Sequence, residues 1–263
     1  MPSEYFFDKD PLKNIHNGRG ILLMCDFDGT LVPIQKDPED CVMLPDIRTK
    51  LEIIVHRSNS FVAILSGRPL SDIRKRVPIE GIHHAGSHGL EISGPQSRYV
   101  RPGTVAGKFI IDKVRTRLEE EINNIPGIFI EKKRFSFALH YRMANKENGA
   151  FVRRAFYKII SENAEGSNIE VLKGKKVLEL APDLSWDKGK AALLIIKRLN
   201  KKCLPVYIGD DVTDESVFKT LSGRGLTVRV GPSKRTAAQY HLKHQNEISR
   251  FLEYINDALP AES

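Results

Sequence analysis

Ile21-Leu22-Leu23-Met24-Cys25-Asp26-Phe27-Asp28-Gly29-Thr30-Leu31 joins an apolar run to two carboxylates, a glycine and a hydroxyl. The run predicts a buried β-strand with the acids at its carboxyl end. Because side chains alternate along an extended segment, Asp26 and Asp28 are expected on one side and Phe27 on the other. Two adjacent carboxylates repel each other unless a proton or a cation is present, and magnesium prefers oxygen ligands. The alternative is a polar turn in which Gly29 supplies a positive φ.

Other apolar runs repeat this arrangement on both sides of that stretch. Phe61 to Leu65 ends in Ser66, and Leu204 to Ile208 ends in Gly209-Asp210-Asp211. A third run, Ile82 to Ala85, leads into Gly86-Ser87-His88-Gly89-Leu90-Glu91. Since ligands of parallel sheets bind beyond the carboxyl ends of the strands, the polar residues at these ends are expected to form one site.

The segments between these runs alternate with them. Val32 to Pro45 is expected to form a loop, and Asp46 to cap a helix with Ile47, Leu51, Ile54 and Val55 at helical spacing. A short helix through Ile73 and Val77 follows the second run. Alternating strands and helices with apolar strands predict an α/β fold with a doubly wound parallel sheet covered on both faces.

The alternation stops between Gly103 and Pro182, where the pattern is helix, two strands, helix, two strands. We therefore expect a core of residues 1–103 and 183–263 and an inserted smaller α/β cap domain of residues 104–182. The residues expected on the buried faces of the two cap helices are Val105, Phe109, Val114, Leu118 and Ile122, and Phe151, Ala155, Phe156 and Ile159. The expected strand pairs are 128–133 with 134–142, and 168–173 with 175–181.

One cap strand has a period of two. Phe135, Phe137, Leu139 and Tyr141 are expected on the face that packs on the helices, and Ser136, His140 and Arg142 on the other. Glu179 is expected among apolar neighbours on another strand, where a carboxylate needs a partner such as a pair of sugar hydroxyls. The polar face would suit a sugar, and a merely solvated face is the alternative.

Composition excludes several classes of protein. The 263 residues, 41% of them apolar, are enough for a core domain and an insert. The net charge of +8 comes from scattered basic residues, which favours an anionic small-molecule substrate over nucleic acid. No apolar run suggests a signal peptide or a membrane span, and the three cysteines, Cys25, Cys41 and Cys203, are unpatterned, so we expect free thiols in the cytoplasm.

Asp26-x-Asp28-Gly29-Thr30-Leu31 resembles the first motif of the haloacid dehalogenase superfamily, and Ser66, Lys188 and Gly209-Asp210-Asp211-x-Thr213-Asp214-Glu215 match its other motifs in the right order. Within that superfamily the chain is similar to the trehalose-6-phosphate phosphatases. The further segments that carry this resemblance are Gly86 to Glu91, Glu131-x-Lys133-x-x-Ser136-x-x-x-His140-Tyr141-Arg142, Lys176-x-x-Glu179 and Lys188-Gly189-Lys190-Ala191.

The resemblance implies a role for each matching residue. Asp26 would be the nucleophile that forms an aspartyl phosphate, Asp28 the general acid and base, and Lys188 and Ser66 would hold Asp26 and the phosphoryl oxygens. Magnesium would be bound by Asp26, the backbone carbonyl of Asp28 and Asp210, with Asp211 and Asp214 adjusting the site. The residues that would bind the substrate are Arg68, His88, Glu91, Glu131, Lys133, Ser136, His140, Arg142 and Glu179.

These roles predict a magnesium-dependent enzyme, expected as a monomer, that hydrolyses trehalose 6-phosphate and has neither nucleic acid nor membrane as a partner. A phosphatase for another phosphosugar, such as sucrose phosphate or mannosyl phosphoglycerate, or a phosphomutase is one alternative. A catalytically inactive relative that only senses a phosphosugar is the other, and the intact Asp26, Asp28, Lys188 and Asp210 weigh against it.

Overall fold

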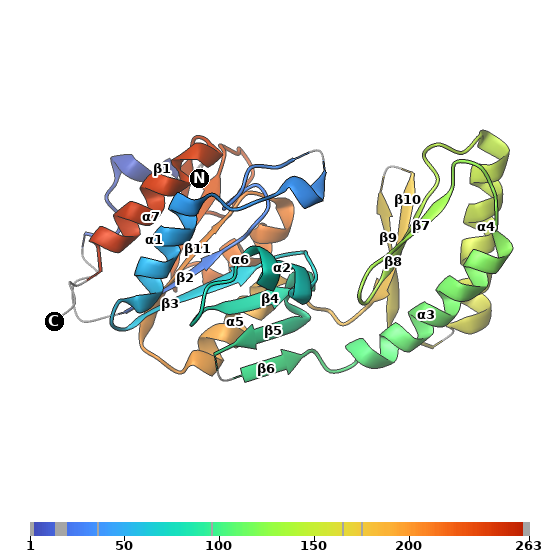
Figure 1. Cartoon of the computed structure of the whole chain (residues 1–263), viewed down its shortest axis with the longest axis horizontal. Helices are drawn as coiled ribbons and strands as arrows, with labels where there is room; N and C mark the ends of the chain where they lie inside the picture. The colour runs from blue at the N-terminus through green and yellow to red at the C-terminus, as the bar shows by residue number, and fades with distance from the viewer. Residues whose placement is uncertain are drawn as a thin grey trace. The chain divides into compact units, whose positions relative to one another are not determined.

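The computed structural model describes residues 3–13, 20–35, 37–95, 97–164, 166–174 and 176–259. The chain divides into two compact units, one made of residues 1–99 and 186–263 and the other of Val100–Ser185 (Figure 1). Each unit has its own sheet and its own apolar core. No helix in the described part of the chain is long and apolar enough to cross a membrane.

A mostly parallel sheet forms the centre of the first unit. Its described strands lie in the order β1-β13-β12-β11-β2-β3-β4-β5-β6. Neighbouring strands from β1 to β4 in this order are parallel, and β5 is antiparallel to β4. The strands are β1 (Glu4–Tyr5), β2 (Gly20–Cys25), β3 (Ser60–Leu65), β4 (His83–Gly86), β5 (Glu91–Gly94), β6 (Ser97–Val100), β11 (Cys203–Gly209), β12 (Leu226–Val230) and β13 (Tyr240–Leu242).

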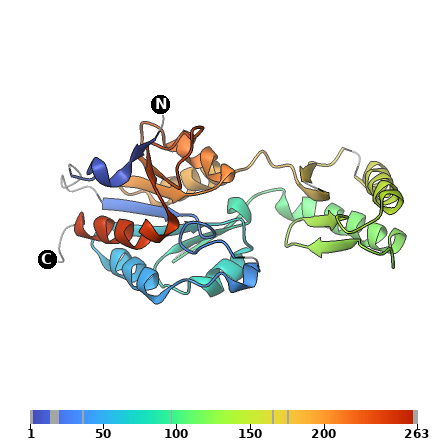
Figure 2. The ribbon, with the colours of Figure 1, turned by 90° about the horizontal axis from the view of Figure 1, so that it is seen from above.

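Helices cover both faces of this sheet, as predicted. On β2, Ile21 and Leu23 pack in the cluster formed with α1, α2 and α7, whereas Leu22 and Met24 pack in the cluster formed with α5 and α6. Figure 1 and Figure 2 both show α1 beside α7. The helices are α1 (Pro45–His56), α2 (Leu70–Arg76), α5 (Lys188–Leu199), α6 (Glu215–Leu221) and α7 (Ile248–Asp257). Short 3-10 turns are η1 (Phe6–Asp8), η2 (Pro38–Asp40), η3 (Ser87–Gly89), η4 (Val212–Asp214) and η5 (Gln245–Glu247).

The order of the strands fixes where a site can form. β2 lies between β3, which the chain reaches through α1, and β11, which it reaches only after the second unit. The strand order therefore reverses at β2, and ligands in such sheets bind beyond the carboxyl ends of the strands at the point of reversal. Asp26, Ser66 and Asp210 each follow directly on one of these three strands.

The second unit is a four-stranded antiparallel sheet in the order β7-β8-β10-β9 with two helices packed against one face. The elements are α3 (Thr104–Glu121), β7 (Phe129–Lys132), β8 (Phe137–His140), α4 (Lys146–Asn163), β9 (Ile169–Gly174) and β10 (Val177–Pro182). They follow the order expected from the sequence.

Three of the side chains expected on the buried faces of these helices are exposed: Val105, Phe109 and Phe151. The buried face of α3 instead runs through Gly107, Ile111, Val114 and Leu118. A Cβ atom at position 107 would come within 3.2 Å of Pro182, so a glycine marks the close approach of helix and sheet, which an apolar pattern does not register. On α4, Val152 takes the buried position.

Element boundaries also differ from the prediction, most clearly at α1 and β8. Asp46 does not cap α1, because Leu44 occupies the N-cap and Pro45 begins the helix; the Asp46 carboxylate pairs with Lys50 from within the first turn. β8 is shorter than expected and ends at His140, so Tyr141 and Arg142 follow the strand, where the backbone N–H of Tyr141 donates to Lys176.

Candidate active site

A buried lysine lies between two buried carboxylates at the centre of the first unit. Lys188 begins α5, whose N-cap residue Asp187 accepts a hydrogen bond from the backbone N–H of Lys190 at 2.8 Å. The Lys188 Nζ atom is 2.8 Å from Asp26 Oδ1 and 2.7 Å from Asp214 Oδ1. The side chains of the lysine and both acids are at most 7% exposed. The helix start therefore holds one ammonium group against two carboxylates at a site buried from solvent.

Three carboxylates, those of Asp26, Asp210 and Asp214, place oxygen atoms within 4.8 Å of one another. Burial raises the pKa of Asp26; the charge of Lys188 opposes this effect and that of Asp214 adds to it. Burial and the charge of Asp214 also raise the pKa of Asp210. Burial alone would lower the pKa of Lys188, but the two carboxylates outweigh it and keep the ammonium charged. One ammonium cannot balance three acids, so the cluster favours a further cation.

Gly29 permits the close approach of Asp210. Its φ is 81°, and a Cβ atom there would lie 2.2 Å from Asp210 Oδ2. The hydroxyl of Thr30 donates to Asp210 Oδ1 at 3.1 Å, so the same turn holds the carboxylate in place. An all-oxygen donor set with excess negative charge fits magnesium better than zinc, for which Cys and His ligands are usual.

Two of the acids expected at the metal lie outside this cluster. Both oxygens of Asp28 accept hydrogen bonds from Arg68, each at 2.7 Å, and Arg68 also pairs with Asp72 at 3.0 Å. The bond to Asp28 is the main cause of a raised pKa of Arg68. The exposed Asp211 is the N-cap of η4 and forms a reciprocal capping box with Asp214, whose Oδ2 accepts from the Asp211 N–H at 2.9 Å.

Backbone hydrogen bonds join the turn after β3 to the turn after β4, beside Asp28. The Ser66 carbonyl accepts from the His88 N–H at 2.9 Å, and the Arg68 carbonyl accepts from the Ser87 N–H at 2.7 Å. Ser87 and His88 have φ angles of 50° and 55°, which cost roughly 1–3 kcal/mol each and persist only where the surroundings impose them. At position 67 a Cβ atom would lie 2.8 Å from the His88 ring, so a larger residue there would displace this ring. The predicted residues Ser66, Arg68 and His88 are thus brought together.

Glu91, the remaining predicted residue of this unit, is fully buried at the start of β5 and pairs with Gly86 in the register of β4.

The second unit carries a polar network on the sheet face opposite its helices. Glu179 accepts from Lys133 Nζ and from the Ser136 hydroxyl, both at 2.7 Å. His140 Nε2 is 2.9 Å from Glu131 Oε2. We call this surface the open face and define it by Glu131, Lys133, Ser136, His140 and Glu179.

Arg142 is exposed and follows the end of β8.

Sequence reasoning missed three residues that contact predicted ones. Tyr207 donates to Asp214 at 2.6 Å, Asp72 pairs with Arg68, and the ring of Phe129 stacks on that of His140 with centroids 4.4 Å apart. A polar hydroxyl inside the apolar run Leu204 to Ile208 was the available signal for Tyr207. The spacing of four positions between Arg68 and Asp72 was the available signal for their ion pair. Nothing in the sequence indicates that Phe129 stacks on His140, because the fold brings these two residues together.

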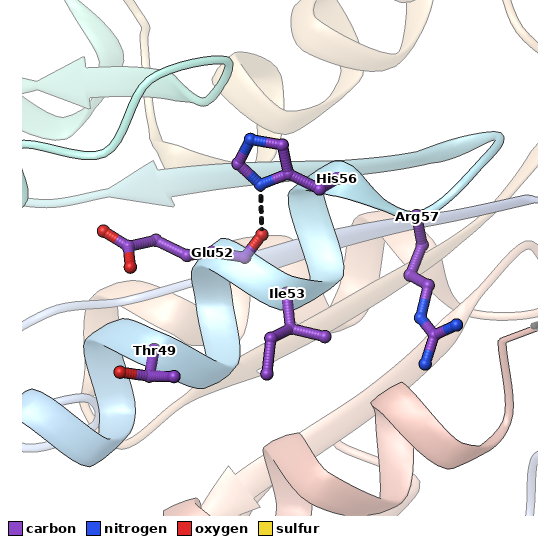
Figure 3. Close-up of a pocket in the computed structure, with 5 residues that line it drawn as sticks. All are labelled: Thr49, Glu52, Ile53, His56 and Arg57. Atoms are coloured by element: carbon purple, nitrogen blue, oxygen red, sulfur yellow. Dashed lines mark hydrogen bonds between the residues drawn. The ribbon is translucent and has the colours of Figure 1, made fainter. Parts of the chain in front are cut away.

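A surface pocket of about 440 Å³ lies on α1 and contains none of these residues (Figure 3). It is lined by Thr49, Glu52, Ile53, His56 and Arg57, and a His56 ring nitrogen lies 2.6 Å from the Glu52 carbonyl. It has no buried charge and is not the candidate site.

The mostly parallel sheet covered by helices on both faces, with acids at the carboxyl ends of its central strands, is the fold of the haloacid dehalogenase-like hydrolases. A haloacid dehalogenase-like hydrolase from Bacteroides thetaiotaomicron has the same fold, with a TM-score of 0.62 and 16% identity over 90% of this chain and all of that one. The trehalose-phosphatase family model matches residues 24–247, and the chain belongs to that family of phosphoric monoester hydrolases.

Individual relatives are described as members of the same family. A protein described as probable trehalose-phosphate phosphatase D from Arabidopsis thaliana is 33% identical over 254 residues, which are 90% of this chain and 68% of that protein. The structure of Aspergillus fumigatus trehalose-6-phosphate phosphatase matches with a TM-score of 0.73 and 28% identity, covering 97% of this chain and 99% of that one.

Proposed function

We propose that this enzyme hydrolyses trehalose 6-phosphate to trehalose and phosphate through an aspartyl phosphate on Asp26. The observation that carries the proposal is the buried carboxylate of Asp26, held at 2.8 Å by Lys188 beside Asp210. A fixed nucleophile next to a fixed cation is what phosphoryl transfer requires, because most of its catalysis is positioning and charge stabilisation. The choice of trehalose 6-phosphate as the substrate rests on the descriptions of the relatives.

In the first step a carboxylate oxygen of Asp26 forms a bond to phosphorus while the bond from phosphorus to the sugar oxygen breaks. Asp28 gives its proton to the departing oxygen. In the second step water attacks the phosphorus, Asp28 takes a proton from it, and the bond to Asp26 breaks, so that phosphate leaves and both acids are restored. Lys188 and the Ser66 hydroxyl stabilise the charge on the phosphoryl oxygens.

Arg68 has to release Asp28 before that acid can carry a proton, since it occupies both carboxylate oxygens. A phosphate dianion offers a guanidinium the same two-point contact as a carboxylate. We infer that the arriving substrate takes over Arg68 and frees Asp28, which would tie the proton donor to the presence of phosphate.

Magnesium is the proposed cofactor, and Asp26, Asp210 and the backbone carbonyl of Asp28 would hold it. When bound, it supplies positive charge that offsets the acids and the phosphate. Asp214 contributes to this site only indirectly, because donors from this chain already occupy both of its oxygens.

We propose that the open face of the second unit binds the sugar. The second unit would then be a cap domain that determines substrate specificity. Its donors and acceptors, Lys133, Ser136, Glu179, Glu131 and His140, are paired with one another and partly exposed. Sugar hydroxyls both donate and accept, so they can replace these partners without leaving a buried group unsatisfied. A cytoplasmic location is proposed from the free thiols of the three cysteines.

A phosphate-release screen over trehalose 6-phosphate, sucrose 6-phosphate, mannosyl phosphoglycerate and glucose 6-phosphate tests the substrate. We expect trehalose 6-phosphate to give the highest kcat/KM, and a clear preference for another phosphosugar would contradict the proposal. Rapid quenching should trap an acid-stable, hydroxylamine-sensitive phosphoenzyme that requires magnesium. D26N should fold normally, form no phosphoenzyme and lose roughly four orders of magnitude in kcat, which is typical of the loss of a catalytic group that acts as part of a unit.

A further inference from the structure

Tyr207 is a fully buried tyrosine in the middle of β11, among apolar side chains of the α5 and α6 cluster. Its ring packs edge-on against Phe218, with centroids 5.8 Å apart. A phenylalanine would satisfy this packing equally well. The hydroxyl is therefore unnecessary for the core, and a buried hydroxyl lowers stability unless it is bonded. Its partner is Asp214 Oδ1, to which it donates at 2.6 Å.

That bond places Tyr207 one contact away from the proposed catalytic lysine. Asp214 Oδ1 receives two donors, the Tyr207 hydroxyl at 2.6 Å and Lys188 Nζ at 2.7 Å, and Oδ2 receives the backbone N–H of Asp211 at 2.9 Å. The same ammonium lies 2.8 Å from Asp26 Oδ1. Lys188 is thus shared between two carboxylates at nearly equal distances.

Two buried carboxylates that share one ammonium compete for it. Any charge that Asp214 keeps on Oδ1 pulls Lys188 away from Asp26 and from the phosphoryl oxygens that Asp26 would contact. A hydroxyl that donates to the same oxygen draws off part of that charge, and such a bond is strong where both partners are buried from solvent. Burial, together with the neighbouring charge of Asp214, raises the pKa of Tyr207 well above its ordinary value, so the hydroxyl remains a donor.

We propose that Tyr207 is a positioning residue of the reaction, which acts by holding Asp214 so that Lys188 is directed at Asp26 and the phosphoryl group. The inference rests on the proposed phosphoryl transfer at Asp26 and does not depend on the identity of the sugar. Because Lys188 acts on the phosphoryl group, which all substrates share, loss of the hydroxyl must affect a small aryl phosphate as much as a phosphosugar.

The chain offers a matched control. Tyr5 in β1 also donates its hydroxyl to a carboxylate, Glu247 Oε1 at 2.5 Å, outside the proposed site. Y207F and Y5F each remove one tyrosine-to-carboxylate bond and leave the ring. We expect Y207F to lower kcat roughly tenfold on both trehalose 6-phosphate and p-nitrophenyl phosphate, with KM unchanged, whereas Y5F keeps the wild-type kcat.

Binding of orthovanadate, a mimic of the transferring phosphoryl group, gives a readout independent of turnover. Calorimetry should show weaker vanadate binding to Y207F by a factor similar to the loss in kcat, and unchanged binding to Y5F. Three results would overturn the proposal. The first is that Y207F lowers thermal stability but leaves kcat unchanged. The second is that kcat falls only on the phosphosugar. The third is that Y207F reaches the full kcat at saturating magnesium but needs a higher magnesium concentration, which would place the effect at the metal.

Incorporation of 3-fluorotyrosine at position 207 covers the case in which Y207F does not fold. Fluorine nearly preserves the volume of the ring and makes the hydroxyl a stronger donor, so kcat should rise above the wild-type value on p-nitrophenyl phosphate. An unchanged or lower kcat would contradict the proposal. The proposed function fails separately, if the wild-type enzyme does not hydrolyse trehalose 6-phosphate or if D26N remains active.

Discussion

The same lysine-to-carboxylate contact occurs in both units in opposite surroundings. In the first unit Lys188 lies 2.8 Å from Asp26, and their side chains are 2% and 7% exposed. In the second unit Lys133 lies 2.7 Å from Glu179, with exposures of 39% and 24%. The distances are nearly equal, so surroundings and not geometry distinguish the two pairs.

Burial changes what such a pair does. A pair in water contributes at most about 1 kcal/mol to stability, because solvent screens it and side-chain entropy opposes it. A buried pair cannot lose one partner without leaving an uncompensated charge. The first arrangement is therefore tied to the fold and suits a reaction that needs fixed charges. The second can exchange its partners for those of a ligand at little cost, as the proposed recognition of a sugar requires.

The largest expected difference between the units is in stability. K188A leaves two carboxylates buried without their cation and should lower the free energy of unfolding by about 3–5 kcal/mol. K133A should lower it by less than about 1 kcal/mol. Urea titrations followed by circular dichroism measure both. Equal losses would mean that the open face is also part of the structural core.

The next largest effect is on substrate specificity, and here the second unit, not the first, is expected to show the loss. K133A and E179Q each remove a charge-assisted contact and should lower kcat/KM for trehalose 6-phosphate roughly tenfold or more, about 1.5–3 kcal/mol. R142A tests the same role for the arginine beyond β8. Hydrolysis of p-nitrophenyl phosphate should hardly change, since this substrate has no sugar. Equal losses on both substrates would instead assign these residues to the chemistry, and no loss on either would mean a solvated face.

The sequence predicted the first unit better than the second because its signals are local. An apolar run that ends in Asp26 or Asp210 marks a buried strand and the site at its carboxyl end, and the pattern needs no knowledge of neighbours. The partners within the site are not local. Lys188 and Asp214 are 26 positions apart, and the pairing of Asp28 with Arg68 spans 40. Their contacts follow only from the way the strands are ordered.

In the second unit the helical period indicated helices correctly but assigned some faces wrongly. Phe109 is large and apolar yet exposed, whereas Gly107 is buried because its missing side chain lets Pro182 approach. A small domain with one covered sheet face has too little interior for every apolar residue. Hydrophobicity alone therefore could not identify the buried side.

Two glycines extend the comparison to the backbone. Gly29 and Gly166 have φ angles of 81° and 73°, so alanine at either position should cost about 1–2 kcal/mol of stability. Among the described residues other than its chain neighbours, none has an atom within 4 Å of a Cβ at position 166, but at position 29 the Cβ would meet Asp210 Oδ2 at 2.2 Å. Only G29A should also lose activity, by roughly a hundredfold, because it displaces the carboxylate. Unfolding and steady-state assays on both variants separate the effects, and an active G29A would argue against Asp210 as a fixed ligand.

The smallest expected effect is on the pH dependence of stability and comes from His84. Its imidazole is buried in β4, whereas the imidazole of His140 lies on the open face. His84 Nε2 lies 2.8 Å from the Val77 carbonyl, and burial lowers its pKa below the ordinary 6.5. The unfolded chain therefore takes up a proton first as the pH falls. The stabilising contribution is complete above pH 6.5 and is lost as the pH falls through that value toward the lower folded pKa. H84Q keeps an N–H for Val77 but cannot titrate, so its thermal midpoint should decline less between about pH 7.5 and about pH 5.5 than that of the wild type. H140Q is the control, and an equal change in both variants would show that burial of His84 is not the cause.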